Sequence, residues 1–274
     1  MSQWIAALPM YNVTPRHAVL WRALLRDALA AFANAGGPTD VALPDEPFGD
    51  LHALWRRGDL LLSQTCGFPY RMLGLRDDVR LIATPRFDAV GCDGPRYRSM
   101  LVVSARAHAG GATTLAACRG LRAAFNGDDS HSGMNALRHA VAPHALDGRF
   151  FGSVTALGSH LNVLRALAAE EVDCAAIDCV TFAYVHDALP GLLKDIRVIG
   201  MSAAAPGLPF VASRALEDTR IAALQDALDV AVAADDERAR VLRLKGFERL
   251  SPNDYDTIER FAQEAAAHGY PALA

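Results

Sequence analysis

Apolar segments of strand length alternate with longer segments of helical period along most of this 274-residue chain. The predicted strands cover residues 5–9, 41–43, 60–63, 79–84, 97–104, 122–125, 151–154, 174–177, 196–201 and 208–212. The predicted helices cover residues 17–32, 48–57, 114–119, 132–139, 160–170, 182–187, 220–233, 237–245 and 254–268, with one more ending at residue 72. This β-α-β-α order predicts an α/β fold in which helices flank both faces of a mostly parallel sheet.

The length of the chain favours two lobes of roughly 100–150 residues each over one compact core. The same sequence pattern occurs at residues 58–64 and 172–178. Each segment has an Asp, then a short apolar strand, then a polar residue at the strand end. In two similar α/β lobes, these strand ends would line one ligand cleft. Chance similarity between two short buried strands is the alternative explanation.

We expect lobe one to contain residues 1–97 and 205–274, and lobe two to contain residues 98–204. Two crossing strands, near residues 97–104 and 201–210, are expected to act as the hinge about which the lobes close.

The composition argues against several classes of partner and site. The net charge is −4 and no long basic run occurs, so a nucleic acid is not an expected partner. No window approaches about 18 uninterrupted apolar residues, so we expect no insertion into a membrane. The five cysteines form no Cys-x-x-Cys pair, and we expect buried thiols, no metal site and no cofactor.

The first residues of the sequence bear on localisation. They lack the basic, apolar and small-residue regions of a secretory signal peptide. The sequence as written therefore predicts a cytoplasmic protein, or a periplasmic one if an upstream export signal has been lost.

Residues 126–135, Asn-Gly-Asp-Asp-Ser-His-Ser-Gly-Met-Asn, are the strongest local indication of a binding site. A predicted strand ends here, a polar turn follows, and a helix begins. The first N–H groups of a helix lack internal partners and carry partial positive charge, so together with the hydroxyls of Ser130 and Ser132 they suit an oxyanion. Gly133 is expected to let a ligand approach the backbone. Helix capping by Ser130 or Ser132 without a ligand is the alternative.

Two other junctions between a strand and a helix carry similar groups. Ser159 and His160 begin a predicted helix, where His160 can donate a hydrogen bond to an oxyanion or simply cap the helix. Gln64, Thr65 and Cys66 lie at a strand end in the first half of the chain, and we expect Cys66 to be a pocket-wall residue rather than a nucleophile.

Taken in order, these segments resemble the phosphate-, phosphite- and phosphonate-binding components of ABC transporters, which have the two-lobed type II periplasmic-binding-protein fold. The resemblance covers roughly residues 5–215. Its most specific part is Ser-x-Ser-Gly at residues 130–133, followed by Gly-Ser-His at 158–160 and Ala-Ile-Asp at 176–178. Pro-Met-Tyr at 9–11 and Tyr-Arg-Ser at 97–99 also contribute.

The resemblance implies roles for the residues of the second lobe. Ser130, His131 and Ser132 are implied to surround the oxygens of a phosphonate-type group, with His160 as a further donor. Asp178 resembles the family's acidic residue, which engages a ligand amine or a protonated oxygen. His131 is a departure, because the family usually has a small hydroxyl residue at that position.

The resemblance also implies contacts from other parts of the chain. Tyr11 is implied to contact the ligand from the first lobe, and Tyr97 begins a crossing strand near the expected cleft. A Tyr that the family often carries in the first-lobe wall is replaced near Cys66.

The leading functional prediction is reversible binding of a small oxyanion or phosphonate-like solute, by a solute-binding or sensing protein. Its partners would be the small anionic ligand and an ABC permease or a signalling partner. The alternative is a cytoplasmic enzyme of the same fold, resembling chorismate dehydratase or dihydroxynaphthoate synthase of the menaquinone pathway. In such an enzyme His160 or His131 would act with Asp178 in acid–base chemistry. The Ser-x-Ser-Gly pattern favours the binding protein.

Overall fold

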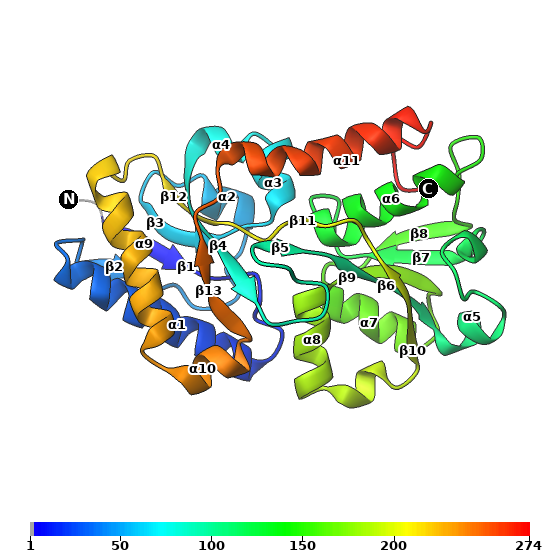
Figure 1. Cartoon of the computed structure of the whole chain (residues 1–274), viewed down its shortest axis with the longest axis horizontal. Helices are drawn as coiled ribbons and strands as arrows, with labels where there is room; N and C mark the ends of the chain where they lie inside the picture. Colours follow the sequence, from blue (N-terminus) through cyan, green and yellow to red (C-terminus); the bar gives the residue numbers. More distant parts are fainter. Residues whose placement is uncertain (1–2) are drawn as a thin grey trace. The chain divides into compact units, whose positions relative to one another are not determined.

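The computed structural model describes residues 3–274, and the chain divides into two compact units. Unit 1 contains the residues up to Asp88, Asp93–Pro95 and Pro206–Tyr255, and unit 2 contains Ala89–Cys92, Arg96–Ala205 and Asp256–Ala274. Each unit is built on one main sheet flanked by helices, so the predicted α/β class is confirmed (Figure 1).

Unit 1 is formed mainly by the first third of the chain. Its elements are β1 (Trp4–Ala7), α1 (Pro15–Asn34), β2 (Val41–Ala42), α2 (Leu51–Trp55), β3 (Leu60–Gln64), α3 (Gly67–Met72), α4 (Leu75–Asp78), β4 (Val79–Phe87), β12 (Phe210–Ser213), α9 (Asp218–Ala233), α10 (Asp236–Val241), β13 (Leu244–Glu248) and η5 (Pro252–Tyr255). The sheet order is β13-β4-β12-β3-β1-β2. Strands β1 to β4 share one direction, because β12 is antiparallel to both β3 and β4, and β13 opposes β4.

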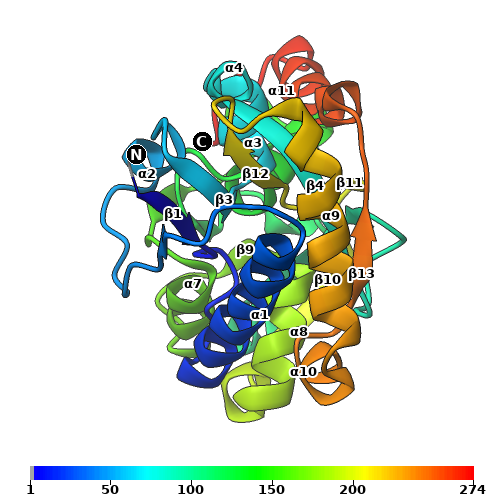
Figure 2. The same cartoon turned by 90° about the vertical axis from the view of Figure 1, so that its left-hand side faces the viewer.

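Helix α1 illustrates how the sequence forms these elements. Thr14 caps the first turn by accepting a hydrogen bond from the backbone N–H of His17, and Pro15 begins the helix, where the missing N–H has no cost. Trp21 and Leu24 lie on the buried face, as their spacing of three residues predicts. Helices α1 and α9 lie side by side in unit 1 (Figures 1 and 2).

Unit 2 is formed mainly by the middle of the chain. Its elements are β5 (Arg96–Tyr97), β6 (Ser99–Ser104), α5 (Ala105–Ala109), η1 (Ala116–Cys118), β7 (Arg122–Phe125), η2 (His131–Asn135), α6 (Ala136–Val141), η3 (Ala142–His144), β8 (Ser153–Ala156), α7 (His160–Ala168), β9 (Cys174–Asp178), α8 (Cys179–Ala188), η4 (Pro190–Leu193), β10 (Ile196–Met201) and α11 (Asp256–Ala267). The sheet order is β10-β6-β9-β7-β8, and only β6 opposes the common direction. Figure 1 shows α6 on one side of this sheet and α7 and α8 on the other.

The chain passes between the units at three main points, residues 95–96, 205–206 and 255–256. At the first two, β5 pairs with β11 (Ala205–Pro206) as a two-stranded sheet. Residues 97–104 were expected to form one crossing strand, but β6 lies within the sheet of unit 2. The third passage was not expected.

The C-terminal segment differs from the expected boundaries. Residues 205–274 were all expected in lobe one, but Asp256–Ala274 belongs to unit 2. Helix α11 packs on α6, and Ala265 and Tyr270 are buried in the hydrophobic core of that unit. This placement follows from the amphipathic face of α11, which must be covered by another element.

Two further elements differ from prediction. Residues 237–245 were expected to form one helix, but the chain leaves α10 at Val241 and enters β13, which pairs with β4. Arg243 adopts a positive φ of 49° between the two elements, which ends the helix. Helix α5 was not predicted at all; Ser104 caps it by accepting from the N–H of Ala107.

Candidate functional site

The carboxyl ends of β8, β7 and β9 meet at one edge of the unit 2 sheet, because these three strands are parallel neighbours. Helix η2 follows β7, α7 follows β8, and α8 follows β9. The structure therefore brings the segment containing Ser132, the start of α7 at His160, and Asp178 to the same edge. Ligands of open α/β sheets bind outside such carboxyl ends.

Ser132 and His160 form the central pair of this edge. The Ser132 Oγ lies 2.8 Å from the His160 Nε2, although 28 positions separate the two residues. Ser99 donates from its Oγ to the Ser132 carbonyl oxygen over 2.8 Å, which fixes the backbone at the pair. Burial lowers the pKa of His160 to about 4, so the imidazole is neutral near pH 7.

The Ser132–His160 pair has one hydrogen-bond donor to spare. The Nδ1 of His160 is buried and has no hydrogen-bond partner within residues 3–274. If the Ser132 hydroxyl donates to Nε2, the proton of the neutral ring lies on Nδ1. If Nε2 donates to Ser132, the hydroxyl hydrogen of Ser132 is available. With either tautomer, the pair can donate a hydrogen bond to an anion.

Ser130 has the capping role that was the alternative prediction. Its Oγ accepts a hydrogen bond from the backbone N–H of Gly133 over 3.0 Å at the start of η2. Gly133 was expected to admit a ligand, and the structure gives another reason for this glycine. A Cβ at position 133 would overlap with the side-chain oxygen of Asn126. Glycine is therefore needed here because the Asn126 side chain lies against the backbone.

The crowding at Gly133 predicts the effect of a substitution. Gly133→Ala is expected to lower the stability by about 1–3 kcal/mol, because the added methyl group must displace Asn126 in a packed region. Thermal unfolding would measure the loss. In the double variant with Asn126→Gly, most of the Gly133→Ala penalty should disappear; additive losses would contradict this explanation.

The His131 side chain is used in the packing of unit 2. Its Nδ1 lies 3.1 Å from the Nδ2 of Asn135, which can only donate, so Nδ1 accepts and the ring is neutral. The ring stacks on Phe261 of α11, with centroids 5.9 Å apart, and lies 6.1 Å from the Tyr97 ring. Burial and, secondarily, the charge of His139 lower the pKa of His131 to about 3. Its expected contribution to an oxyanion site is therefore its backbone, not its imidazole.

Asp178 and Ser159 both cap helices. The Oδ1 of the buried Asp178 accepts from the backbone N–H groups of Val180 and Thr181, over 2.7 and 2.9 Å. These bonds hold the carboxylate at the end of β9. The Ser159 Oγ accepts from the backbone N–H of Asn162 over 3.1 Å, which matches the capping alternative for this junction.

Gln64 is the last residue of β3, and Thr65 and Cys66 lie between β3 and α3 of unit 1; all three are buried. The Nε2 of Gln64 donates to the Leu208 carbonyl over 3.3 Å, while its buried Oε1 has no partner within the described part of the chain. The Thr65 hydroxyl is directed to the backbone oxygen of Cys66. Gln64 thus retains an acceptor at the carboxyl end of β3.

Tyr11 lies in the aromatic core of unit 1. Its ring centroid is 5.3 Å from that of Phe87 and 6.3 Å from that of Trp21, and the residue is 2% exposed. The ring of Tyr11 thus packs in the core of unit 1, and the ligand contact that the resemblance implied stays a prediction.

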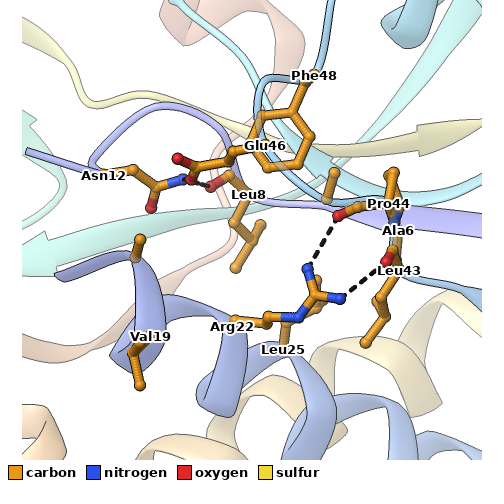
Figure 3. Close-up of a pocket in the computed structure, with 12 residues that line it drawn as sticks. Ala6, Leu8, Asn12, Val19, Arg22, Leu25, Leu43, Pro44, Glu46 and Phe48 are labelled. Atoms are coloured by element: carbon orange, nitrogen blue, oxygen red, sulfur yellow. Dashed lines mark hydrogen bonds between the residues drawn. The ribbon is translucent and has the colours of Figure 1, made fainter. Parts of the chain in front are cut away.

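Unit 1 also has a mainly apolar cavity of about 170 Å³ next to β1, α1 and the segment after β2 (Figure 3). At its edge the Asn12 side chain donates to the Leu8 carbonyl and to Glu46. Arg22 donates to the carbonyl oxygens of Leu43 and Pro44 over 2.9 Å each. No predicted site residue lines this cavity. Leu43, Pro44 and Glu46 directly follow β2, so the cavity lies beside the end of a strand that the sequence predicts.

Among residues 3–274, no group of three or more His, Cys, Asp or Glu side chains is arranged to hold a metal ion. Within the same residues, no helix combines the length and the apolar character that a membrane crossing requires.

The sequence matches the profile of a known family, described as the ABC transporter phosphonate periplasmic substrate-binding protein, over residues 42–257. Since the match covers more than half of the chain, the chain belongs to this family of solute-binding proteins. No curated protein matches the sequence.

Solved structures agree on the fold. A binding protein component of an ABC phosphonate transporter from Pseudomonas aeruginosa has a TM-score of 0.75 at 17% identity, over 98% of this chain and 88% of that chain. A protein from Prochlorococcus marinus in complex with methylphosphonate has a TM-score of 0.74 at 16% identity, over 96% and 98% of the two chains. A protein from Xanthomonas citri bound to ATP has a TM-score of 0.70 at 15% identity, over 98% of both chains. The fold is thus the type II periplasmic-binding-protein fold.

Proposed function

We propose that this protein binds a phosphonate or a similar small oxyanion reversibly at the carboxyl edge of β8, β7 and β9. The observation that supports this site is the Ser132–His160 pair, which has a spare donor beside the start of α7. Family membership supports the ligand class. Asp178 lies at the end of the neighbouring strand and could accept from a ligand amine or a protonated oxygen.

The proposed site binds an anion through neutral donors. A buried lysine left unpaired in the ligand-free protein would carry a large desolvation cost. Hydroxyl, neutral imidazole and backbone N–H groups avoid that cost and still stabilise an oxyanion, aided by the partial positive charge at the start of a helix. Ser132, His160 and the backbone of His131 are the proposed donors.

Gln64, Thr65, Cys66 and Tyr97 remain proposed ligand contacts. For Gln64 the support is its buried and unpartnered Oε1, which could accept a hydrogen bond from a protonated ligand group. For the other three, the support is their position at the end of β3 or in β5.

We further propose that the protein delivers its ligand to an ABC permease. Family membership supports this role and a periplasmic site of action, where an uptake receptor meets its solute. The comparisons give the enzyme alternative no support, because the matching family and the phosphonate-related structures are solute-binding proteins.

A ligand screen tests the proposed function. Methylphosphonate, phosphite and phosphate would each be added to the full chain, with sodium chloride at equal ionic strength and benzoate as controls. A ligand present at about 100 times its Kd should raise the free energy of unfolding by about 2.7 kcal/mol, which corresponds to roughly 5–10 °C in Tm. Titration calorimetry would confirm any shift. The proposal fails if none of methylphosphonate, phosphite and phosphate shifts the Tm, whether or not benzoate does.

A further inference from the structure

Cys92 and Cys179 lie side by side in unit 2. Their Sγ atoms are 3.5 Å apart, although the residues are 87 positions apart in the sequence. Cys92 ends the short stretch Ala89–Cys92 that unit 2 holds, and Cys179 is the first residue of α8. All five cysteines of the chain are reduced thiols in the structure.

The backbone around the two cysteines is arranged for close approach. Gly91 has a φ of +100°, in the region that favours glycine. A Cβ at this position would lie only 3.0 Å from the Cβ of Cys179 and 3.3 Å from its Sγ. The backbone N–H of Cys179 donates to the Arg98 carbonyl over 3.2 Å, which anchors the start of α8. The loop before Cys92 is therefore packed directly against Cys179.

We propose that Cys92 and Cys179 form a reversible intramolecular disulfide. A disulfide places its sulfurs about 2.05 Å apart, so the two Sγ atoms must approach by about 1.5 Å. Cys92 is partly exposed, and Asp93 and Gly94 after it are exposed, so this loop can supply the movement. Family membership fits the proposal, because disulfides form and persist in the oxidising periplasm.

The proposed reaction is thiol–disulfide exchange with an external disulfide such as oxidised glutathione. The thiolate of the accessible Cys92 attacks one sulfur of the oxidant and releases one glutathione thiolate. Cys179 then attacks the Cys92 sulfur of the mixed disulfide and releases the second glutathione. The two protein thiols lose two protons and two electrons, and the oxidant gains them as two thiols.

A second cysteine pair provides a matched control. Cys118 and Cys174 are hydrogen-bonded to each other, which lowers the pKa of Cys118 and raises that of Cys174. Both side chains are fully buried, so no external disulfide can reach either of them in the folded protein. Oxidation of the folded chain should therefore distinguish between the two pairs.

The disulfide would tie the ends of a long segment of unit 2. Residues 92–179 include β6, β7, β8 and β9, and the segment ends directly after Asp178. Closing a loop of this size stabilises the folded state by restricting the unfolded chain. The expected rise in Tm is roughly 5–10 °C.

The test compares the full-length protein in oxidised glutathione with the same protein in dithiothreitol. Digestion without reduction, by a protease that cleaves before aspartate, separates Cys174 from Cys179. Mass spectrometry should then find residues 88–92 linked to residues 178–186, together with the higher Tm. Cys92→Ala should abolish both the linked peptide and the Tm rise, and Cys118→Ala should retain both.

Three outcomes would overturn the proposal. One is a glutathione adduct on Cys92 that never resolves, and another is a disulfide-linked dimer through Cys92 without the internal link. The third is a Tm rise that survives Cys92→Ala and disappears in Cys118→Ala.

Discussion

Replacing Ser132 with alanine is expected to weaken methylphosphonate binding by about 10- to 100-fold. A hydrogen bond to a charged group contributes about 1.5–3 kcal/mol, and each 1.4 kcal/mol changes Kd tenfold. The substitution removes one donor and also breaks the contact with the His160 Nε2, which lies 2.8 Å away. It therefore removes both the hydroxyl and the group that orients the imidazole. Titration calorimetry at pH 7 gives Kd for both proteins.

Ser153→Ala is the matched control for the affinity measurement. Ser153 is an exposed residue of β8 in the same unit, away from the end of the strand where α7 follows. Its replacement should leave Kd unchanged. His160→Ala should weaken binding to a similar extent as Ser132→Ala, and the double variant should lose less than the sum, because the two side chains act as a pair. Equal affinity of wild type and Ser132→Ala would place the site elsewhere.

The regular elements of the fold could be predicted largely from local patterns. Strand β10 has the predicted limits, Ile196–Met201, because its apolar run is bounded by polar and turn residues. The strand β13 could not be predicted in this way, because Lys245 and Gly246 interrupt its apolar pattern and its stability comes from pairing with β4. For α11, the apolar face with Ile258 and Phe261 predicts that the helix packs against another element. The sequence does not identify that element as α6.

The candidate site was predicted only in part, for a similar reason. The residues at the ends of β7, β8 and β9 could be identified because polar residues follow apolar strands. Capping and ligand binding require the same residue types at the same positions, so the sequence could not assign Ser130 and Ser159 to capping. The contact between Ser132 and His160 depends on the parallel pairing of β7 and β8, which local sequence does not encode.

Lowering the pH from 7 to 5 is expected to destabilise the protein through its buried histidines. Burial lowers the pKa of His131 to about 3 and that of His160 to about 4, whereas an unfolded histidine has a pKa of about 6.5. Between these values the unfolded chain binds protons that the folded chain does not, so the stability falls as the pH falls. At pH 5 the loss from His131 alone is about 2 kcal/mol, or roughly 4–8 °C in Tm.

The variant His131→Phe isolates the contribution of His131. Phenylalanine keeps a ring against Phe261 and cannot be protonated, and the Asn135 Nδ2 retains its hydrogen bond to the Ile258 carbonyl. The Tm at pH 7 can change with the packing, so the readout is the slope of Tm between pH 6.5 and pH 5. That slope should become shallower in His131→Phe than in the wild type.

The carboxylate that pairs with His139 does not share this signature. His139 lies against Phe261 and pairs with Glu264 over 2.7 Å, and Arg138 bonds to the Asn135 side chain. The hydrogen bond with His139 lowers the pKa of Glu264, so stability from that carboxylate is lost only below its unfolded pKa, near pH 4.3. The window from pH 6.5 to pH 5 therefore separates the buried histidines from the carboxylates. An equal slope in wild type and His131→Phe would contradict the prediction, because it would mean that His131 binds protons equally in the folded and the unfolded chain.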